Sequence, residues 1–269
     1  MKNMFNTSLK FAWNKAAIAT MATTLALGAG ITSAQADTIT VAVAANFTKA
    51  AEQIGAQWTK ETGNKVRFSF GPTGGLYSQI NNGAPFDAFF SADTKAPERL
   101  VKAGKASDYR VYAQGKLALY STSLPVAKQH DQIIKAAEFN HIAVANPKAA
   151  PYGAAAETVL KKMGMYDKLK SEQKLVTGES ITATFQFVMT GNAQLGFVAL
   201  SQIMDPQSPA HNKGEYWLVP QKDYAPINQG AVLITSSKHA KTAKEFLDYM
   251  NSPAAKKIIE SYGYSHVPD

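Results

Sequence analysis

The sequence contains no cysteine among its 269 residues. Disulfide frameworks, thiolate zinc sites and cysteine nucleophiles are therefore excluded. Charged residues make up only 18% of the chain and apolar residues 45%, and this balance excludes an intrinsically disordered protein. No apolar run after residue 36 approaches the roughly 18 residues that a membrane-spanning helix needs. What remains is a globular protein of one or two domains.

A strong charge surplus is also lacking. The 28 Lys and Arg residues exceed the 20 Asp and Glu residues, but three of the lysines precede residue 37, where no acidic residue occurs. The basic residues that follow alternate with acidic ones, as in Lys60-Glu61, and form no dense basic stretch. Nucleic-acid binding is therefore not expected, whereas the mild surplus is compatible with attraction of a small anion.

Residues 1–36 have the pattern of a secretory signal peptide. A basic region runs to Lys15, an apolar stretch follows from Ala16 to Ile31, and the small residues Ser33-Ala34-Gln35-Ala36 come next. Cleavage after Ala36 would start the mature chain at Asp37. A membrane anchor is the alternative, but the apolar stretch is short and is diluted by threonines. We therefore expect an exported protein, and the lack of cysteine suits an oxidising compartment.

The rest of the chain alternates strand-like runs with helical patterns, which predicts an α/β fold. The expected strands are 38–44, 66–70, 86–91, 141–145 and 195–199, and the expected helices are 46–62, 94–103, 152–163, 180–190, 239–250 and 252–262. Two long β-like runs, 111–121 and 227–235, flank the middle third of the chain. Such runs would carry the chain to a second lobe and back. We expect lobe 1 to comprise 37–115 and 228–269, and lobe 2 to comprise 116–227.

The familiar enzyme motifs are missing. The five histidines are isolated from one another, and no HExxH, GxSxG, GxGxxG or P-loop pattern occurs. We therefore do not expect an enzyme. Two alternatives come from other classes of function. One is an exported enzyme on a similar scaffold, and the other is an adhesion or interaction module.

A different feature recurs five times: a strand ends in a small or hydroxyl-bearing turn that opens a helix. These turns are 44–46, 71–75, 91–94, 151–153 and 179–181. A helix N-terminus presents unpaired N–H groups and the positive end of the helix dipole, so it can bind an oxyanion without a fixed cation. The strands of an α/β sheet bring their ends to a shared crevice. The five turns together therefore indicate an anion site, although each polar residue alone could simply cap its helix.

Several of these segments resemble the periplasmic molybdate-binding proteins of ABC importers. The segments are Ile39–Thr48 (ITVAVAANFT), Phe70–Leu76 (FGPTGGL), Asn82–Asp87 (NGAPFD), Ser91–Asp93 and Leu195–Val198. Their combination in this order is specific, and the similarity runs from about Thr38 to Gly263. The resemblance implies a type II periplasmic-binding fold with two α/β lobes, mixed sheets flanked by helices, and two β crossovers that serve as a hinge. It also implies a protein that captures molybdate, and tungstate as well, and delivers the anion to a membrane permease. Such a protein is a monomer and needs no cofactor.

The resemblance also implies a set of oxyanion-binding residues, namely Asn46, Thr73, Ala92, Tyr152 and Ile181. Asn46 and Thr73 match side-chain positions, and Ala92 and Ile181 match positions whose backbone N–H groups face the anion. Some members supply a tyrosine hydroxyl from the position of Ala199, which has no side-chain donor. We expect the Tyr152 hydroxyl to replace it. Pro72 departs from the family's serine-rich turn and has no N–H to donate.

These residues suit a fully deprotonated dianion, which only accepts hydrogen bonds. Each bond to a charged partner contributes roughly 1.5–3 kcal/mol, so about six donors can offset desolvation without Arg or Lys. Protonated phosphate would leave its own hydrogen unpaired in such a site. Sulfate is also fully ionised, so only the size of the cavity can exclude it. A binding protein for sulfate or another tetrahedral oxyanion therefore stays the alternative.

Overall fold

The computed structural model describes residues 36–265. The expected signal peptide and its apolar stretch lie outside the described residues. Within 36–265, no helix combines the length and the apolar character that crossing a bilayer requires.

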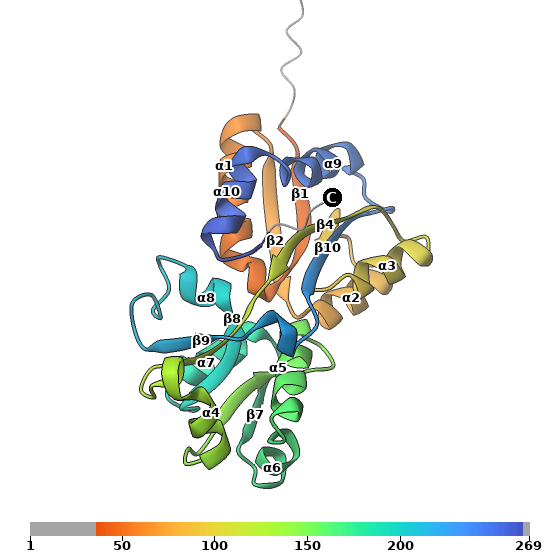
Figure 1. The fold of residues 1–269 in the computed structure, drawn as a ribbon. Coiled ribbons are helices and arrows are strands. Elements are labelled where there is room, and N and C mark those ends of the chain that lie inside the picture. Colours follow the sequence, from red (N-terminus) through yellow and green to blue (C-terminus); the bar gives the residue numbers. More distant parts are fainter. Residues whose placement is uncertain (1–35, 266–269) are drawn as a thin grey trace, which may run out of the picture. The chain divides into compact units, whose positions relative to one another are not determined.

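Two mixed five-stranded sheets organise the described chain, as the sequence predicts (Figure 1). The first has the order β2-β1-β3-β10-β4, and its strands are β1 (Thr38–Ala44), β2 (Lys65–Gly71), β3 (Ala88–Phe90), β4 (Ala106–Gly115) and β10 (Ile227–Ile234). Strand β1 is parallel to β2 and β3, whereas β10 is antiparallel to β3 and β4. The parallel strands β1, β2 and β3 therefore end at one edge of this sheet.

Helices cover both faces of the first sheet. They are α1 (Thr48–Thr62), which follows the 3-10 turn η1 (Ala45–Phe47), and α2 (Thr73–Asn81), α3 (Lys95–Lys102), α9 (Ala240–Tyr249) and α10 (Pro253–Ser261). Val41 and Val43 of β1 pack with the aromatic cluster under α1, α9 and α10, whereas Ala42 between them packs with α2 and α3. This alternation is the two-residue period of a strand buried on both faces. The rings of Trp58 and Phe246 meet edge to face at 5.1 Å in the larger cluster.

The second sheet has the order β7-β6-β8-β5-β9. Its strands are β5 (Leu117–Ser121), β6 (Ile142–Ala145), β7 (Leu175–Gly178), β8 (Leu195–Ala199) and β9 (Glu215–Leu218). Its helices are α4 (Val126–Ala136), α5 (Pro151–Lys162), α6 (Tyr166–Ser171), α7 (Ile181–Met189) and α8 (Leu200–Met204). Strand β6 is parallel to β7 and β8, so the strand ends before α5 and α7 lie at one edge of the sheet.

The chain passes between the sheets twice. Lys116 alone separates β4 of the first sheet from β5 of the second. On the return, β9 is followed by the 3-10 turn η2 (Gln221–Asp223) and then by β10. The expected β-like run 111–121 consists of two strands that pair in different sheets, which is the arrangement that a crossover requires. The expected lobe boundary after Gly115 falls at the first connection, and the one before Asn228 falls one residue inside β10; both stay predictions.

Most predicted elements are confirmed, including the ends of several helices. Ser180 and Ser252 cap α7 and α10, where their hydroxyls accept the N–H groups of Ala183 and Ala255, each at 3.1 Å. Gly63 ends α1 in the left-handed conformation at φ 78°, as its position predicts. Helices α4, α6 and α8 and the edge strand β9 were not expected from the sequence.

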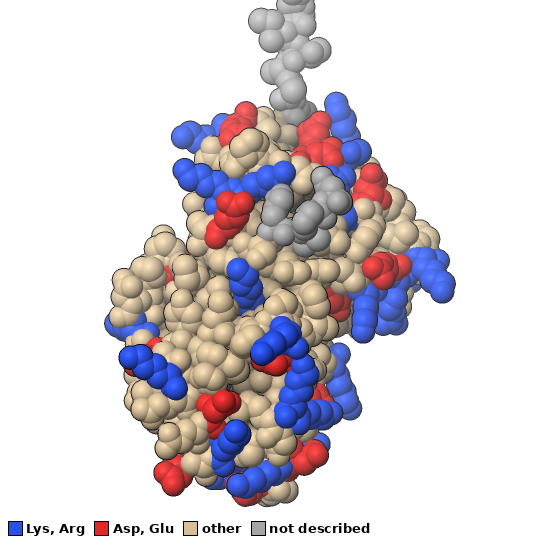
Figure 2. All heavy atoms as spheres, viewed as in Figure 1, with Lys and Arg blue, Asp and Glu red and all other residues tan. Residues whose placement is uncertain are grey.

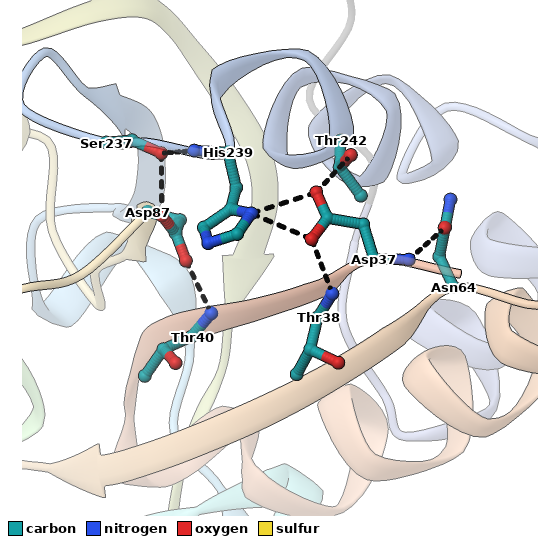
Figure 3. Close-up of polar contacts among 8 residues, drawn as sticks. All are labelled: Asp37, Thr38, Thr40, Asn64, Asp87, Ser237, His239 and Thr242. Atoms are coloured by element: carbon teal, nitrogen blue, oxygen red, sulfur yellow. Dashed lines mark hydrogen bonds and ion pairs between the residues drawn. The ribbon is translucent and has the colours of Figure 1, made fainter. Parts of the chain in front are cut away.

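A polar network joins the start of β1 to α9 (Figure 3). The Asp37 carboxylate lies 2.7 Å from Nδ1 of His239, and it accepts the Thr242 hydroxyl at 2.9 Å and the Thr38 N–H at 2.8 Å. The Asp37 N–H donates to Oδ1 of Asn64 at 3.0 Å. These contacts, with the bond to His239 contributing most, hold the pKa of Asp37 below its usual value. The first residue of the expected mature chain is thus bound in the fold.

Candidate functional site

All five expected site residues line one small cavity between the two sheets' helices. The lining residues are Ala44, Ala45, Asn46, Pro72, Thr73, Ala92, Ala150, Pro151, Tyr152 and Ile181. None of these ten residues is charged. The volume of about 10 Å³ is near the minimum that holds one water molecule, so a larger ligand requires the walls to move apart.

The topology explains this meeting point. Asn46 lies in η1 directly after β1, Thr73 is the first residue of α2 after β2, and Ala92 follows β3. Tyr152 is the second residue of α5, and Ile181 is the first residue of α7. Strands that end at the same sheet edge therefore place the N-termini of several helices around one point, where first-turn N–H groups have no intrahelical acceptor.

The Thr73 hydroxyl is oriented by a backbone group. Its Oγ1 accepts the N–H of Ala92 at 3.0 Å, and the side chain is buried. The hydroxyl proton has no acceptor within residues 36–265 and can be donated into the cavity. The Ala92 N–H, expected to face an anion, is instead bonded to Thr73. The alternative role as a helix cap does not apply, because Pro72 precedes α2 and no side-chain cap bond forms there.

Tyr152 is fully buried and is oriented in the same manner. Its hydroxyl oxygen accepts Nε2 of Gln229 at 3.2 Å. Burial raises the pKa of Tyr152 well above its usual value, so the hydroxyl keeps its proton. Among the residues that the structure describes, none accepts that proton. Tyr152 is therefore a neutral phenol that lines the cavity, and its role as a donor to a ligand stays a prediction.

The Asn46 side chain has a different environment from the one expected. Its Nδ2 donates to Oε1 of Gln229 at 3.1 Å and to the Tyr264 hydroxyl at 3.0 Å, which uses both amide hydrogens. The η1 turn forms no side-chain cap bond, so the capping alternative does not apply here either. The group of Asn46 that is free to bind an anion is its backbone N–H, near the start of the turn.

Ile181 contributes a backbone N–H at the N-terminus of α7. Gln202 links this position to Ala199, since its Nε2 donates to the Ile181 carbonyl at 3.1 Å and its Oε1 accepts the Ala199 N–H at 3.0 Å. Ala199 itself is buried and is not among the cavity-lining residues. No side chain reaches the cavity from that position.

Two larger cavities adjoin the small one. One, of about 500 Å³, shares residues such as Thr73 and Ala92 with it and is also lined by three basic residues and one acidic residue, namely Lys95, Arg99, Lys148 and Asp93. The other, of about 470 Å³, shares Asn46 and is lined by a single lysine, Lys49, and by Asp205. Basic side chains thus border one approach to the site but not the site itself. On the face in Figure 2, basic and acidic side chains are interspersed rather than gathered in a stripe.

Metal chelation has no support in the described part of the chain. Across residues 36–265, no three His, Asp or Glu side chains lie close enough together to hold a metal ion. The cavity is lined by uncharged residues, of which Asn46, Thr73 and Tyr152 carry polar side chains.

Sequence reasoning missed the polar residues behind the cavity. Gln229, Tyr112 and Tyr264 are all buried and hydrogen-bonded to one another or to the site. Gln229 carries the one available signal, because it is a polar residue within the apolar strand Ile227–Ile234. Its partners lie up to 183 positions away in the sequence, so no local pattern identifies them.

Comparison with known proteins supplies relatives over almost the whole described chain. The family model for bacterial extracellular solute-binding proteins matches residues 39–265. The molybdate-binding protein ModA of Azotobacter vinelandii is 48% identical over 89% of this chain and 95% of its own length. ModA of Rhodobacter capsulatus is 45% identical over 90% of this chain and 94% of its own length. The solved structure of the Azotobacter vinelandii periplasmic molybdate-binding protein matches with a TM-score of 0.81 at 38% identity, over 86% of this chain and 100% of that one.

Proposed function

The chain belongs to the bacterial extracellular solute-binding proteins, and we propose that it captures molybdate in the periplasm and delivers it to the permease of an ABC importer. The relatives that match most of its length are named as molybdate-binding proteins. The observation that carries the proposal is the uncharged cavity into which the Thr73 and Tyr152 hydroxyls can donate. A dianion that only accepts hydrogen bonds suits this donor set.

The proposed ligand-binding residues remain Asn46, Thr73, Ala92, Tyr152 and Ile181. Thr73 and Tyr152 would donate through their hydroxyls, and Asn46 and Ile181 through their backbone N–H groups. Ala92 would act by holding Thr73, because its N–H donates to Oγ1 of that residue. The positive ends of the helix dipoles of α2, α5 and α7 add to the attraction without a fixed cation.

Entry of the anion requires the two lobes to separate, because the cavity is smaller than a tetrahedral oxyanion. We assign lobe 1 to 37–115 and 228–269, and lobe 2 to 116–227. Only a few polar contacts join them at the site, among them the bond from the Gly74 N–H to the Ala149 carbonyl at 3.0 Å. The connections at Lys116 and between β9 and β10 would serve as the hinge.

Several finer points belong to the same proposal. Tungstate has nearly the same size and charge as molybdate and would bind as well. The protein would act as a monomer without cofactor or catalytic activity, after cleavage of a signal peptide behind Ala36. Sulfate or another tetrahedral oxyanion is the alternative ligand.

A panel of anions tests the ligand class. A ligand that binds only the folded protein raises its melting temperature according to RT ln(1 + [L]/Kd). Molybdate and tungstate should raise the melting temperature strongly, and sulfate and phosphate little, at equal concentration and ionic strength. An equal shift with sulfate would favour the alternative ligand, and no shift with any anion would contradict the proposed function.

A further inference from the structure

Gln229 lies behind the cavity and bonds to three residues around it. It is completely buried in β10, the strand that returns from the second sheet to the first. Its Oε1 accepts Nδ2 of Asn46 at 3.1 Å and the Tyr112 hydroxyl at 2.9 Å. Its Nε2 donates to the Tyr152 hydroxyl oxygen at 3.2 Å. One amide thus contacts a residue after β1 and a residue of α5.

The contacts of this amide indicate its orientation. Oε1 accepts Nδ2 of Asn46, whose other amide hydrogen goes to Tyr264, and it also lies 2.9 Å from the Tyr112 hydroxyl, which has the Ser91 carbonyl as a second acceptor at 3.1 Å. In this orientation Nε2 faces Tyr152. Because Nε2 donates to the phenol oxygen, the Tyr152 proton points away from Gln229, and Tyr152 lines the cavity.

The close approach of these two side chains depends on Gly115 at the end of β4. A Cβ at this position would lie 2.0 Å from the Tyr152 hydroxyl oxygen and 2.7 Å from Nε2 of Gln229. Both distances are shorter than any real contact, so only glycine leaves room for the pair. The last residue before the first crossover therefore takes part in shaping the site.

We propose that Gln229 is a positioning residue that fixes the Tyr152 hydroxyl as a donor-only group and thereby sets the selectivity of the cavity. The inference rests on the proposed function, since it concerns the same anion. With Gln229 in place, the phenol oxygen is occupied as an acceptor and its proton is directed at the ligand. A fully deprotonated oxyanion gains a hydrogen bond, whereas a protonated one, such as hydrogen phosphate, finds no acceptor for its own proton.

A double-mutant cycle tests whether Gln229 acts through the Tyr152 hydroxyl. Gln229→Met keeps the length of the side chain and removes both polar ends, and Tyr152→Phe removes only the hydroxyl. By calorimetry, Gln229→Met should weaken molybdate binding about tenfold when Tyr152 is present and less than about twofold in the Tyr152→Phe background. The ratio of molybdate to phosphate affinity should fall in Gln229→Met, which a purely structural role would not cause.

The controls separate the possible failures. Gln114→Met changes the same residue type in the neighbouring strand β4, where the amide donates only to Asn228, and should leave molybdate affinity unchanged. Gln229→Asn keeps an amide but is one carbon too short to reach Tyr152, and it replaces Gln229→Met if that variant does not fold. Equal losses in both backgrounds, or no loss, would overturn the inference. Unchanged affinity in Tyr152→Phe itself would instead contradict the proposed ligand role of Tyr152.

Discussion

The backbone N–H of Ala92 donates to the Thr73 hydroxyl oxygen at 3.0 Å, and so joins the segments that follow β3 and β2, the two strands on either side of β1. The bond leaves the proton of the Thr73 hydroxyl available for donation. Gln229 does the same to Tyr152 from the opposite side. Each of these two hydroxyl oxygens thus already accepts one N–H group, which leaves its proton available for donation. This shared arrangement distinguishes the cavity from an ordinary polar crevice.

Replacement of Thr73 by the isosteric valine should separate its two roles. The loss of a bond to a charged ligand should weaken molybdate binding about 10- to 150-fold. The buried Ala92 N–H would also lose its acceptor, which should lower the free energy of unfolding by about 1–3 kcal/mol. Calorimetry and urea unfolding measure the two effects. Thr62→Val, whose hydroxyl donates to the Trp58 carbonyl, is the control and should keep its affinity. Stability loss with unchanged affinity would leave Thr73 with a structural role alone.

Substitution of Gly115 by alanine should impair the site without adding charge. A Cβ would overlap the Tyr152 hydroxyl, so Tyr152 must move away from the cavity or β4 must shift. We expect molybdate affinity to fall at least about tenfold, as for loss of the Tyr152 bond. Gly71→Ala is the matched control, because its Cβ would meet nothing nearer than the Leu76 side chain at 3.6 Å. If Gly115→Ala binds molybdate as tightly as Gly71→Ala, the placement of the Tyr152 hydroxyl does not matter for binding.

The network of Asp37 predicts a pH dependence of stability. Its bonds to His239, Thr242 and Thr38 lower the pKa of Asp37 in the folded protein. The resulting stabilisation is present above the unfolded pKa of about 3.9 and is lost as the pH falls through the lower folded pKa. Asp37→Asn should therefore lower the melting temperature at neutral pH and reduce its fall below about pH 4. If the melting temperatures of the wild type and of Asp37→Asn fall in parallel as the pH is lowered, the network contributes no pH-dependent stability.

Processing of the exported chain can be checked separately. The basic region, the apolar stretch and the small residues before Asp37 predict cleavage after Ala36. N-terminal sequencing of the exported protein should begin at Asp37, whose α-amino group would then face Asn64 as its N–H does here. Recovery of the intact chain in the membrane fraction would support an anchor instead.

The sequence predicted the elements whose signal is local, and not those that depend on tertiary pairing. The alternating, β-branched run before Ala44 and the glycine after Thr62 are readable within a few residues. An expected lobe boundary also falls at Lys116, but the partners of the two flanking strands cannot be read locally, because they pair with segments far away in the sequence. The amphipathic helix Val126–Ala136 lacks a strong start signal and was missed.

The same limit applies to the site. The turns that end at Asn46 and Thr73 could be found because small residues follow strands there, and the resemblance to a family added Tyr152. The use of the Asn46 amide by Gln229 and Tyr264 could not be predicted, since these partners lie 183 and 218 positions away. Chemistry carried by residue type is readable from sequence, whereas the direction of a hydrogen bond requires the assembled fold.

Titration of the wild type and of Tyr152→Phe with molybdate tests the central claim most directly. The variant keeps the buried ring and loses only the hydroxyl that we propose as a donor to the ligand. Tyr120→Phe is the matched control, because that buried hydroxyl donates to the Lys213 carbonyl away from the site. The account predicts that Tyr152→Phe weakens molybdate binding about 10- to 150-fold while Tyr120→Phe does not. Wild-type affinity in a folded Tyr152→Phe protein would contradict it.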